Sequence, residues 1–214
     1  MRCGLDEAGR GPVIGPLVIA AVMVDNESEL RKMGVKDSKR LMPSKRSELA
    51  KKIKEIAEVN VCIIDVAEID SRGDERSLNE LEIEKFAELI VKMRPKEVFI
   101  DACDPVEENF RRSIMERLDY SPDMVCEHKA DQTYPVVSAA SIVAKVTRDE
   151  LVKEIGASLG CQVGSGYPGD DVTIEFIKSW IKEKGDLPPH TRRSWETSRR
   201  LLSESKIRKL TYWE

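Results

Sequence analysis

Paired cysteines and long apolar runs are both missing from this chain of 214 residues. Its five cysteines stand singly, with no CxxC pair, and an odd number argues against a disulfide framework. The longest apolar run, residues 12–24, is interrupted by Gly15 and Pro16, whereas a membrane helix needs roughly 20 apolar residues. The first residues also lack the basic stretch and apolar core of a secretory signal. We therefore expect a soluble, cytoplasmic protein that does not enter a membrane.

Positive charge is in deficit over the whole chain, which has a net charge of -4 and a pI of about 5.5. This balance is unusual for a protein that binds nucleic acid. The charge is nevertheless segregated: residues 31–54 hold ten Lys and Arg against two Asp and Glu, and residues 55–110 hold six against sixteen. From Leu187 onward the count is seven against three. Two basic patches on an acidic body suit a polyanion that docks along a defined track, and solvated helix faces are the alternative.

The order of the apolar segments indicates an α/β fold. Short runs, mostly rich in β-branched residues, predict strands at 2–5, 17–24, 59–66, 97–101 and 124–127. Apolar residues at helical spacing predict helices at about 44–56, 78–93, 106–118 and 136–155, and two more follow a glycine-rich loop at 164–171. Three strands come first, helices and strands then alternate, and only helices follow. This order predicts a mixed sheet flanked by helices, with a helical region at the C-terminal end.

Acidic residues close two of the predicted strands and follow a third. Asp6 and Glu7 end the first strand, and Asp101 ends the fourth. Asp131 lies in a predicted short loop after the fifth strand. Because adjacent residues on a strand point to opposite faces, a site shared by Asp6 and Glu7 needs the chain to bend there.

If these strands are neighbours in one sheet, the four carboxylates meet, and like charges that close need a cation. Mg²⁺ and Mn²⁺ favour carboxylate oxygens, and two such ions about 4 Å apart can stabilise the attacking and leaving oxygens of a phosphodiester displacement. Strand-end caps and solvated loop acids are the alternative interpretation.

Two long motifs and several shorter ones stand in a fixed order along the chain. They are DEAGRGPVIGPLV at 6–18, DSK at 37–39, the strand ending in Asp101, HKADQTYPVVSAASIVAKVTRD at 128–149, and GSGYPGD at 164–170. Together they resemble the type 2 ribonuclease H (ribonuclease HII) family, in forms that look more archaeal than bacterial. The resemblance implies a ribonuclease H-like fold with a five-stranded mixed sheet flanked by helices. It places the catalytic domain at residues 1–171 and a C-terminal helical region at 172–214.

The same resemblance implies an activity. Members of this family are endonucleases that hydrolyse the RNA strand of RNA/DNA hybrids. They also cut on the 5′ side of ribonucleotides embedded in duplex DNA, leaving 3′-hydroxyl and 5′-phosphate ends, a role in ribonucleotide excision during DNA replication and repair. Two Mg²⁺ or Mn²⁺ ions would take part in catalysis. The catalytic, metal-binding carboxylates carried over onto this chain are Asp6, Glu7, Asp101 and Asp131.

The resemblance also implies how substrate is held. Backbone groups of Gly9, Arg10 and Gly11 would touch the 2′-hydroxyl of the ribonucleotide. Tyr167 would pack against the sugar just 3′ of it and so favour an RNA-to-DNA step. Two further candidates, for the substrate backbone, are Lys39 and Lys145. A plain loop aromatic is the alternative for Tyr167, and a solvated side chain for either lysine. His128 fits packing or hydrogen bonding better than a role as general base.

Two rival functions compete with this interpretation. Another nuclease with the same fold, such as a junction resolvase or a transposase-type domain, keeps a carboxylate cluster but does not need the pairing of the Gly9–Gly11 loop with Tyr167. The second rival, a catalytically silent hybrid-binding module, gains no support from the sequence, because all four carboxylates are present. We expect a monomer that binds RNA/DNA hybrids and ribonucleotide-containing duplex DNA, and a sliding clamp is a further partner to test.

Overall fold

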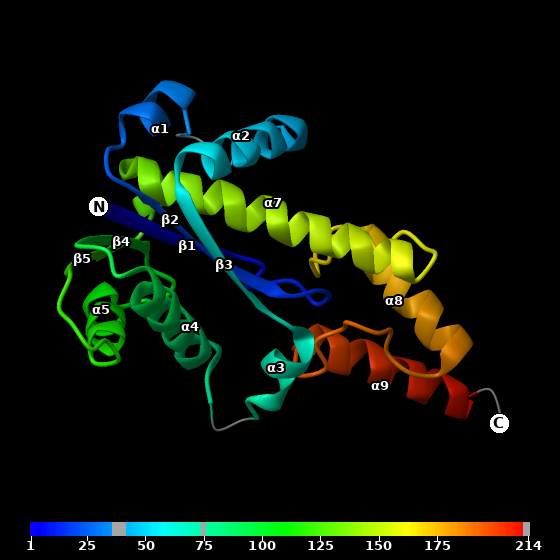
Figure 1. Cartoon of the computed structure of the whole chain (residues 1–214). Helices are drawn as coiled ribbons and strands as arrows, with labels where there is room; N and C mark the ends of the chain where they lie inside the picture. Colours follow the sequence, from blue (N-terminus) through cyan, green and yellow to red (C-terminus); the bar gives the residue numbers. More distant parts are fainter. Residues whose placement is uncertain (36–41, 74–75, 212–214) are drawn as a thin grey trace. The chain divides into compact units, whose positions relative to one another are not determined.

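The computed structural model describes residues 1–35, 42–73 and 76–211, so Lys39 lies outside the described residues (Figure 1). The chain divides into two compact units. The first comprises residues 1–8, 18–63 and 74–147, and the second comprises residues 9–17, 64–73 and 148–214. The boundary that we place after residue 171 stays a prediction. Within the described part of the chain, no helix is both long and apolar enough to cross a membrane.

A five-stranded sheet forms the centre of the first unit, in the order β3-β2-β1-β4-β5. Its strands are β1 (Arg2–Ala8), β2 (Leu17–Val24), β3 (Glu58–Ile64), β4 (Glu97–Asp101) and β5 (Asp123–Glu127). Strand β1 runs antiparallel to β2 and parallel to β4, and β4 runs parallel to β5. The sheet is therefore mixed, with flanking helices, as the sequence predicts.

Strands β2 and β1 differ in how well their ends could be predicted from the sequence. All eight residues of β2 are buried, which explains why it reads as one continuous apolar run. Strand β1 extends beyond the predicted end at Leu5, because its backbone pairs with β2 as far as Ala8 opposite Val18. Ladder hydrogen bonds come from the backbone, so the acidic side chains near its end do not stop the strand.

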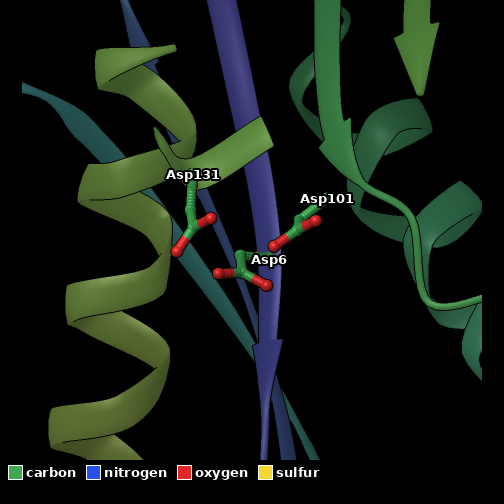
Figure 2. A group of neighbouring side chains, drawn as sticks. All are labelled: Asp6, Asp101 and Asp131. Atoms are coloured by element: carbon green, nitrogen blue, oxygen red, sulfur yellow. The ribbon is translucent and has the colours of Figure 1, made fainter. Parts of the chain in front are cut away.

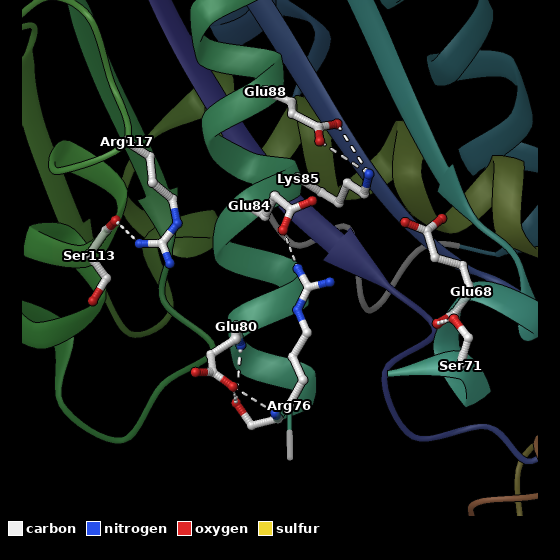
Figure 3. A network of polar contacts seen from close by, with 10 residues as sticks. Glu68, Ser71, Arg76, Glu80, Glu84, Lys85, Glu88, Ser113 and Arg117 are labelled. Carbon is white, nitrogen blue, oxygen red and sulfur yellow. Dashed lines mark hydrogen bonds and ion pairs between the residues drawn. The ribbon is translucent and has the colours of Figure 1, made fainter. Parts of the chain in front are cut away.

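The first unit also contains several helices. They are α1 (Ser28–Met33), α2 (Pro43–Ile56), α4 (Leu78–Met93), α5 (Glu107–Met115), α6 (Ala130–Thr133) and the first half of α7 (Pro135–Ser158). Helix α4 begins with a capping box in which Ser77 and Glu80 satisfy each other's backbone N–H groups. Figure 3 shows Glu80 at this end, with Lys85 paired to Glu88 farther along the helix. The helix ends before Arg94, which takes a left-handed conformation ahead of Pro95.

Close packing sets the start of α7 directly on β1. A Cβ atom on Gly4 would overlap the carbonyl carbon of Val136, so only glycine lets the two backbones come this near. The first turns of α7 consequently lie beside the end of β1 that carries Asp6. This contact positions the polar side chains of α7 described below.

The second unit is built from α3 (Val66–Ser71), the last part of α7, α8 (Asp171–Lys184), α9 (Glu196–Thr211) and the loop 9–17. Its apolar core includes Val13 and Ile14 from that loop together with buried residues of the C-terminal segments, namely Ile155, Val163, Ile177, Ile181, Leu187 and Leu201. The loop 9–17 is therefore anchored in the same core as the helical tail.

Candidate functional site

Three aspartates meet in the first unit. Asp6 comes from β1, Asp101 is the last residue of β4, and Asp131 lies in α6 (Figure 2). One carboxylate oxygen from each lies within 4.8 Å of the other two. Asp6 and Asp131 are buried and Asp101 is half-buried. The sequence predicts this convergence of acidic residues at strand ends, and the structure brings these three together.

Backbone geometry holds the three residues in place. Parallel pairing of Leu5 with Ile100 brings the ends of β1 and β4 side by side, which places Asp6 near Asp101. The N–H of Lys129 donates to Oδ1 of Asp101 at 2.8 Å.

The prediction of a loop around Asp131 is wrong, because Asp131 lies in the short helix α6. Lys129 adopts a left-handed conformation, with φ of 60°, and turns the chain after β5. The N–H of Tyr134 then donates to the carbonyl of Ala130 and closes one helical turn. The hydroxyl of Ser138 on α7 donates to the Asp131 carbonyl, so α7 fixes this turn from the other side.

Glu7 lies beside this group rather than in it. Strand β1 runs regularly through Asp6 and Glu7, which pair with Ala20 and Ile19, so their side chains point to opposite faces. The bend that a site shared by Asp6 and Glu7 would need is absent, since the strand continues to Ala8. Glu7 still acts on its neighbour, since its N–H donates to Oδ1 of Asp6 at 2.7 Å.

Electrostatics at the cluster favour a bound cation. Burial raises the pKa of Asp6 well above its usual value, and the negative charges of Glu7 and Asp101 raise it further. A hydrogen bond from Ser141 and the N–H of Glu7 oppose this rise in the pKa of Asp6 without cancelling it. The donor set consists only of carboxylate oxygens, which suits a hard divalent ion such as Mg²⁺ or Mn²⁺. The residues present therefore fit a metal centre.

In the second unit, the loop 9–17 lies against the GSGYP segment at residues 164–168. Gly9 has φ of 97°, and a Cβ there would lie 2.7 Å from the Pro16 carbonyl oxygen, so this turn requires glycine. The N–H groups of Val13 and Ile14 both donate to the Gly166 carbonyl, at 2.8 and 3.2 Å. The two segments that the sequence singles out thus form one hydrogen-bonded assembly.

Tyr167 lies against this loop and over a buried arginine. A Cβ built on Gly11 would lie 3.6 Å from Cε1 of Tyr167, which is ordinary packing distance. The guanidinium of Arg148 lies 4.9 Å from the centroid of the tyrosine ring, and its Nη1 donates to the Ser165 carbonyl at 2.7 Å. Arg148 is buried and also pairs with Asp149. The ring is packed on one side and 36% exposed overall, so it can meet a ligand.

A second buried arginine, Arg192 of the C-terminal segment, binds the loop 9–17 through hydrogen bonds. Arg192 donates from Nε to the Gly15 carbonyl at 3.0 Å, from Nη1 to that of Arg10 at 3.0 Å, and from Nη2 to that of Gly9 at 2.6 Å. Its side chain is fully buried. Burial lowers the pKa of Arg192 to about 10, helped by the positive charge of Arg148, so the guanidinium keeps its charge at neutral pH.

Sequence reasoning missed the roles of Arg148 and Arg192. Arg148 shares a polar stripe of α7 with Ser141 and Lys145, and that stripe is the signal that could have indicated it. Nothing in the sequence separates Arg192 from Arg193 beside it.

Two further residues singled out on the sequence lie in the first unit. Lys145 is half-buried on α7. His128 is hydrogen-bonded, with its Nδ1 3.1 Å from the Ala102 carbonyl oxygen, which agrees with the packing or hydrogen-bonding role that we expect.

The mixed five-stranded sheet, with acidic residues gathered where β1 and β4 end, defines the chain as an enzyme with a ribonuclease H-like fold. The family described as Ribonuclease HII matches residues 3–198. Ribonuclease HII of Thermococcus sibiricus is 46% identical over 211 residues, covering 96% of this chain and 92% of the relative. The chain belongs to the ribonuclease HII family, and it is a metal-dependent endoribonuclease of the kind that acts on the RNA strand of RNA/DNA hybrids.

Solved structures agree with this assignment. The ribonuclease H2 from Pyrococcus horikoshii OT3 has a TM-score of 0.89 and 42% identity, covering 96% of this chain and 98% of that one. A structure of the PCNA:RNase HII complex from Archaeoglobus fulgidus has a TM-score of 0.88 and 40% identity, covering 94% and 96%. Archaeal proteins dominate the relatives, as the resemblance indicates.

Proposed function

We propose that this chain cuts the RNA strand of RNA/DNA hybrids, and also duplex DNA on the 5′ side of an embedded ribonucleotide, leaving 3′-hydroxyl and 5′-phosphate ends. The observation that carries the proposal is the group of Asp6, Asp101 and Asp131, two of them buried and Asp101 half-buried, with oxygens within 4.8 Å of one another. The raised pKa of Asp6 supports it, because a bound cation would offset the burial and the like charges that raise this pKa.

The proposed catalytic residues are Asp6, Asp101 and Asp131, which meet in the structure, and Glu7, which the family resemblance adds although its side chain points to the other face of β1. The proposed cofactor is Mg²⁺ or Mn²⁺, with two ions during catalysis. Bound divalent ions lower the pKa of water and stabilise negative charge on a leaving oxygen. The chain's own task is to keep its carboxylates in place: Ser141 holds Asp6, and the Lys129 N–H holds Asp101. No histidine is needed as a general base in this scheme.

Recognition of the ribonucleotide is assigned to the second unit, and two lysines of the first unit are assigned to the substrate backbone. Backbone groups of Gly9, Arg10 and Gly11 approach the 2′-hydroxyl, the group that distinguishes RNA from DNA. Tyr167, packed beside Gly11, meets the sugar on the 3′ side of the ribonucleotide. Lys39 and Lys145 hold phosphates, which makes binding weaker as the salt concentration rises.

The test is cleavage of a DNA duplex that carries one ribonucleotide, with Mg²⁺, with Mn²⁺ and with EDTA. We expect a single cut 5′ of the ribonucleotide that needs either metal, and none in the matched all-DNA duplex. The Asp101→Asn variant is the paired control for the site, and it should bind the duplex like the wild type without cutting it. A cut in EDTA, or full activity of Asp101→Asn, would overturn the proposal.

We also propose a monomer that can bind PCNA, supported by the similarity to the Archaeoglobus fulgidus protein seen in a PCNA complex. Size-exclusion chromatography coupled to light scattering gives the mass of the chain alone and with an archaeal PCNA. Coelution at the summed mass is expected, and separate elution at micromolar concentrations would contradict the partnership.

A further inference from the structure

Arg192 fixes the direction of two peptide planes in the Gly9–Gly11 loop. Its Nη2 and Nη1 bind the carbonyl oxygens of Gly9 and Arg10. In a trans peptide, the N–H of the next residue points opposite to the carbonyl. The N–H groups of Arg10 and Gly11 are therefore directed away from the buried guanidinium. These are backbone donors of the segment that we assign to the 2′-hydroxyl.

The arginine is itself held rigidly within the second unit. Its own N–H donates to the Val13 carbonyl at 2.8 Å, and its guanidinium lies 4.7 Å from the centroid of the Trp195 ring. Asp70 of α3 accepts hydrogen bonds from Ser194 and from the backbone N–H of Arg193. Because its backbone N–H and its guanidinium are both held, Arg192 can set the geometry of the loop.

Charge and shape explain why arginine occupies this position. A planar guanidinium offers five N–H donors in a fixed fork, which matches three carbonyl oxygens spread over the loop. A lysine keeps the charge but concentrates its donors on one nitrogen, so it cannot span three separate acceptors in the same way. Buried carbonyls left without a donor would reorient, and the peptide planes would turn with them.

We propose that Arg192 is a positioning residue for ribonucleotide recognition, which sets the Gly9–Gly11 peptide planes so that their N–H groups face the 2′-hydroxyl. This inference rests on the proposed function and deepens it. It gives the C-terminal region a part in choosing the substrate, beyond any contact of its basic residues with phosphates.

The test compares dissociation constants, in EDTA, for two duplexes that differ only in one ribonucleotide. The variants are Arg192→Gln and Arg192→Lys, and the matched control is Arg193→Gln, since Arg193 is adjacent but exposed and pairs with Asp186. Wild type and Arg193→Gln should prefer the ribonucleotide duplex. In both Arg192 variants, the ratio of the dissociation constants for the two duplexes should fall roughly tenfold. The affinity for the all-DNA duplex should be nearly unchanged.

Circular dichroism and thermal melting show whether each variant is folded. If Arg192→Gln is not folded, Arg192→Lys decides, because it retains the charge and most of the side-chain stem. An unchanged preference in a folded Arg192 variant overturns this inference and leaves the proposed function intact. A wild type that shows no preference, and does not cut the ribonucleotide duplex with metal present, contradicts the proposed function itself.

Discussion

The guanidinium of Arg148 lies over the ring of Tyr167, 4.9 Å from its centroid. The same side chain donates to the carbonyl of Ser165, two residues before the tyrosine. A cation over an aromatic face contributes about 0.5–2 kcal/mol, more when it is desolvated, and Arg148 is buried. These two contacts of Arg148 position the ring of Tyr167 beside Gly11.

Replacing Tyr167 should reduce cleavage at an RNA-to-DNA step. We expect Tyr167→Ala to slow cutting at a single ribonucleotide by about tenfold or more, since loss of a packed aromatic ring costs on the order of 1–3 kcal/mol. Tyr167→Phe keeps the ring and should stay within about threefold of the wild-type rate. Single-turnover cleavage measures both, and equal rates for the alanine and phenylalanine variants would contradict a role for the ring.

The turn at Gly9 should not accept a side chain. A Cβ at this residue would lie 2.7 Å from the Pro16 carbonyl oxygen, and φ is 97°. Gly9→Ala should cost about 1–3 kcal/mol, which lowers the melting temperature by several degrees in a chain of this size. Gly169→Ala is the control, because a Cβ built there meets no atom within 4 Å apart from its own residue and its chain neighbours. Equal melting temperatures for the two variants would refute the strain argument.

Asp6 should destabilise the protein when no divalent ion is present. Its pKa is raised in the folded state, by burial first and then by Glu7 and Asp101, so the folded chain holds this proton more tightly than the unfolded chain. Asp6 therefore lowers the free energy of unfolding at pH values above its usual pKa of 3.8, and it has no such effect below that pH. Metal-free Asp6→Asn should melt at a higher temperature than wild type at pH 7.

Addition of Mn²⁺ gives the complementary measurement on the same two proteins. The ion should raise the melting temperature of the wild type and have a much smaller effect on Asp6→Asn. A metal-free variant that melts below the wild type at pH 7 would argue against the electrostatic account of this site.

Asp170 should stabilise the loop that carries Tyr167. Hydrogen bonds from the backbone and hydroxyl of Ser165 lower the pKa of Asp170 to about 2, and its side chain also caps α8 by accepting from the Val172 N–H. Because this pKa is depressed, the stabilisation is present above the usual value of 3.8 and is lost as the pH falls through about 2.

The Asp170→Ala variant measures this contribution. Loss of a helix cap costs about 0.5–2 kcal/mol, so the variant should melt a few degrees below wild type at pH 7. This difference in melting temperature should disappear as the pH falls from 4 to 2. The control variant Asp171→Ala, which removes the neighbouring acid, should lower the melting temperature less. A gap that stays constant with pH would contradict the assignment.

Elements whose ends are encoded locally could be predicted from the sequence. Strand β2 and helix α4 agree residue for residue with their predicted ranges. The first is a continuous apolar run, and the second lies between a capping box and Pro95. The meeting of Asp6 with Asp101 was also predictable, because both stand at the ends of strands that pair in parallel.

Features that depend on tertiary contacts could not be predicted in this way. The helical turn at Asp131 forms because Lys129 takes a left-handed conformation and Ser138 binds the turn from α7. The importance of Arg192 comes from carbonyl oxygens that lie 177 to 183 residues earlier in the chain. Neither contact leaves a periodic signal in the sequence.

The most direct test of the metal centre is an anomalous difference map from crystals soaked in Mn²⁺. The account predicts manganese peaks within coordination distance, about 2.0–2.6 Å, of carboxylate oxygens of Asp6, Asp101 and Asp131. The peaks should be lost or weakened in Asp101→Asn. Manganese bound elsewhere, with none at these aspartates while cleavage still needs metal, would contradict it.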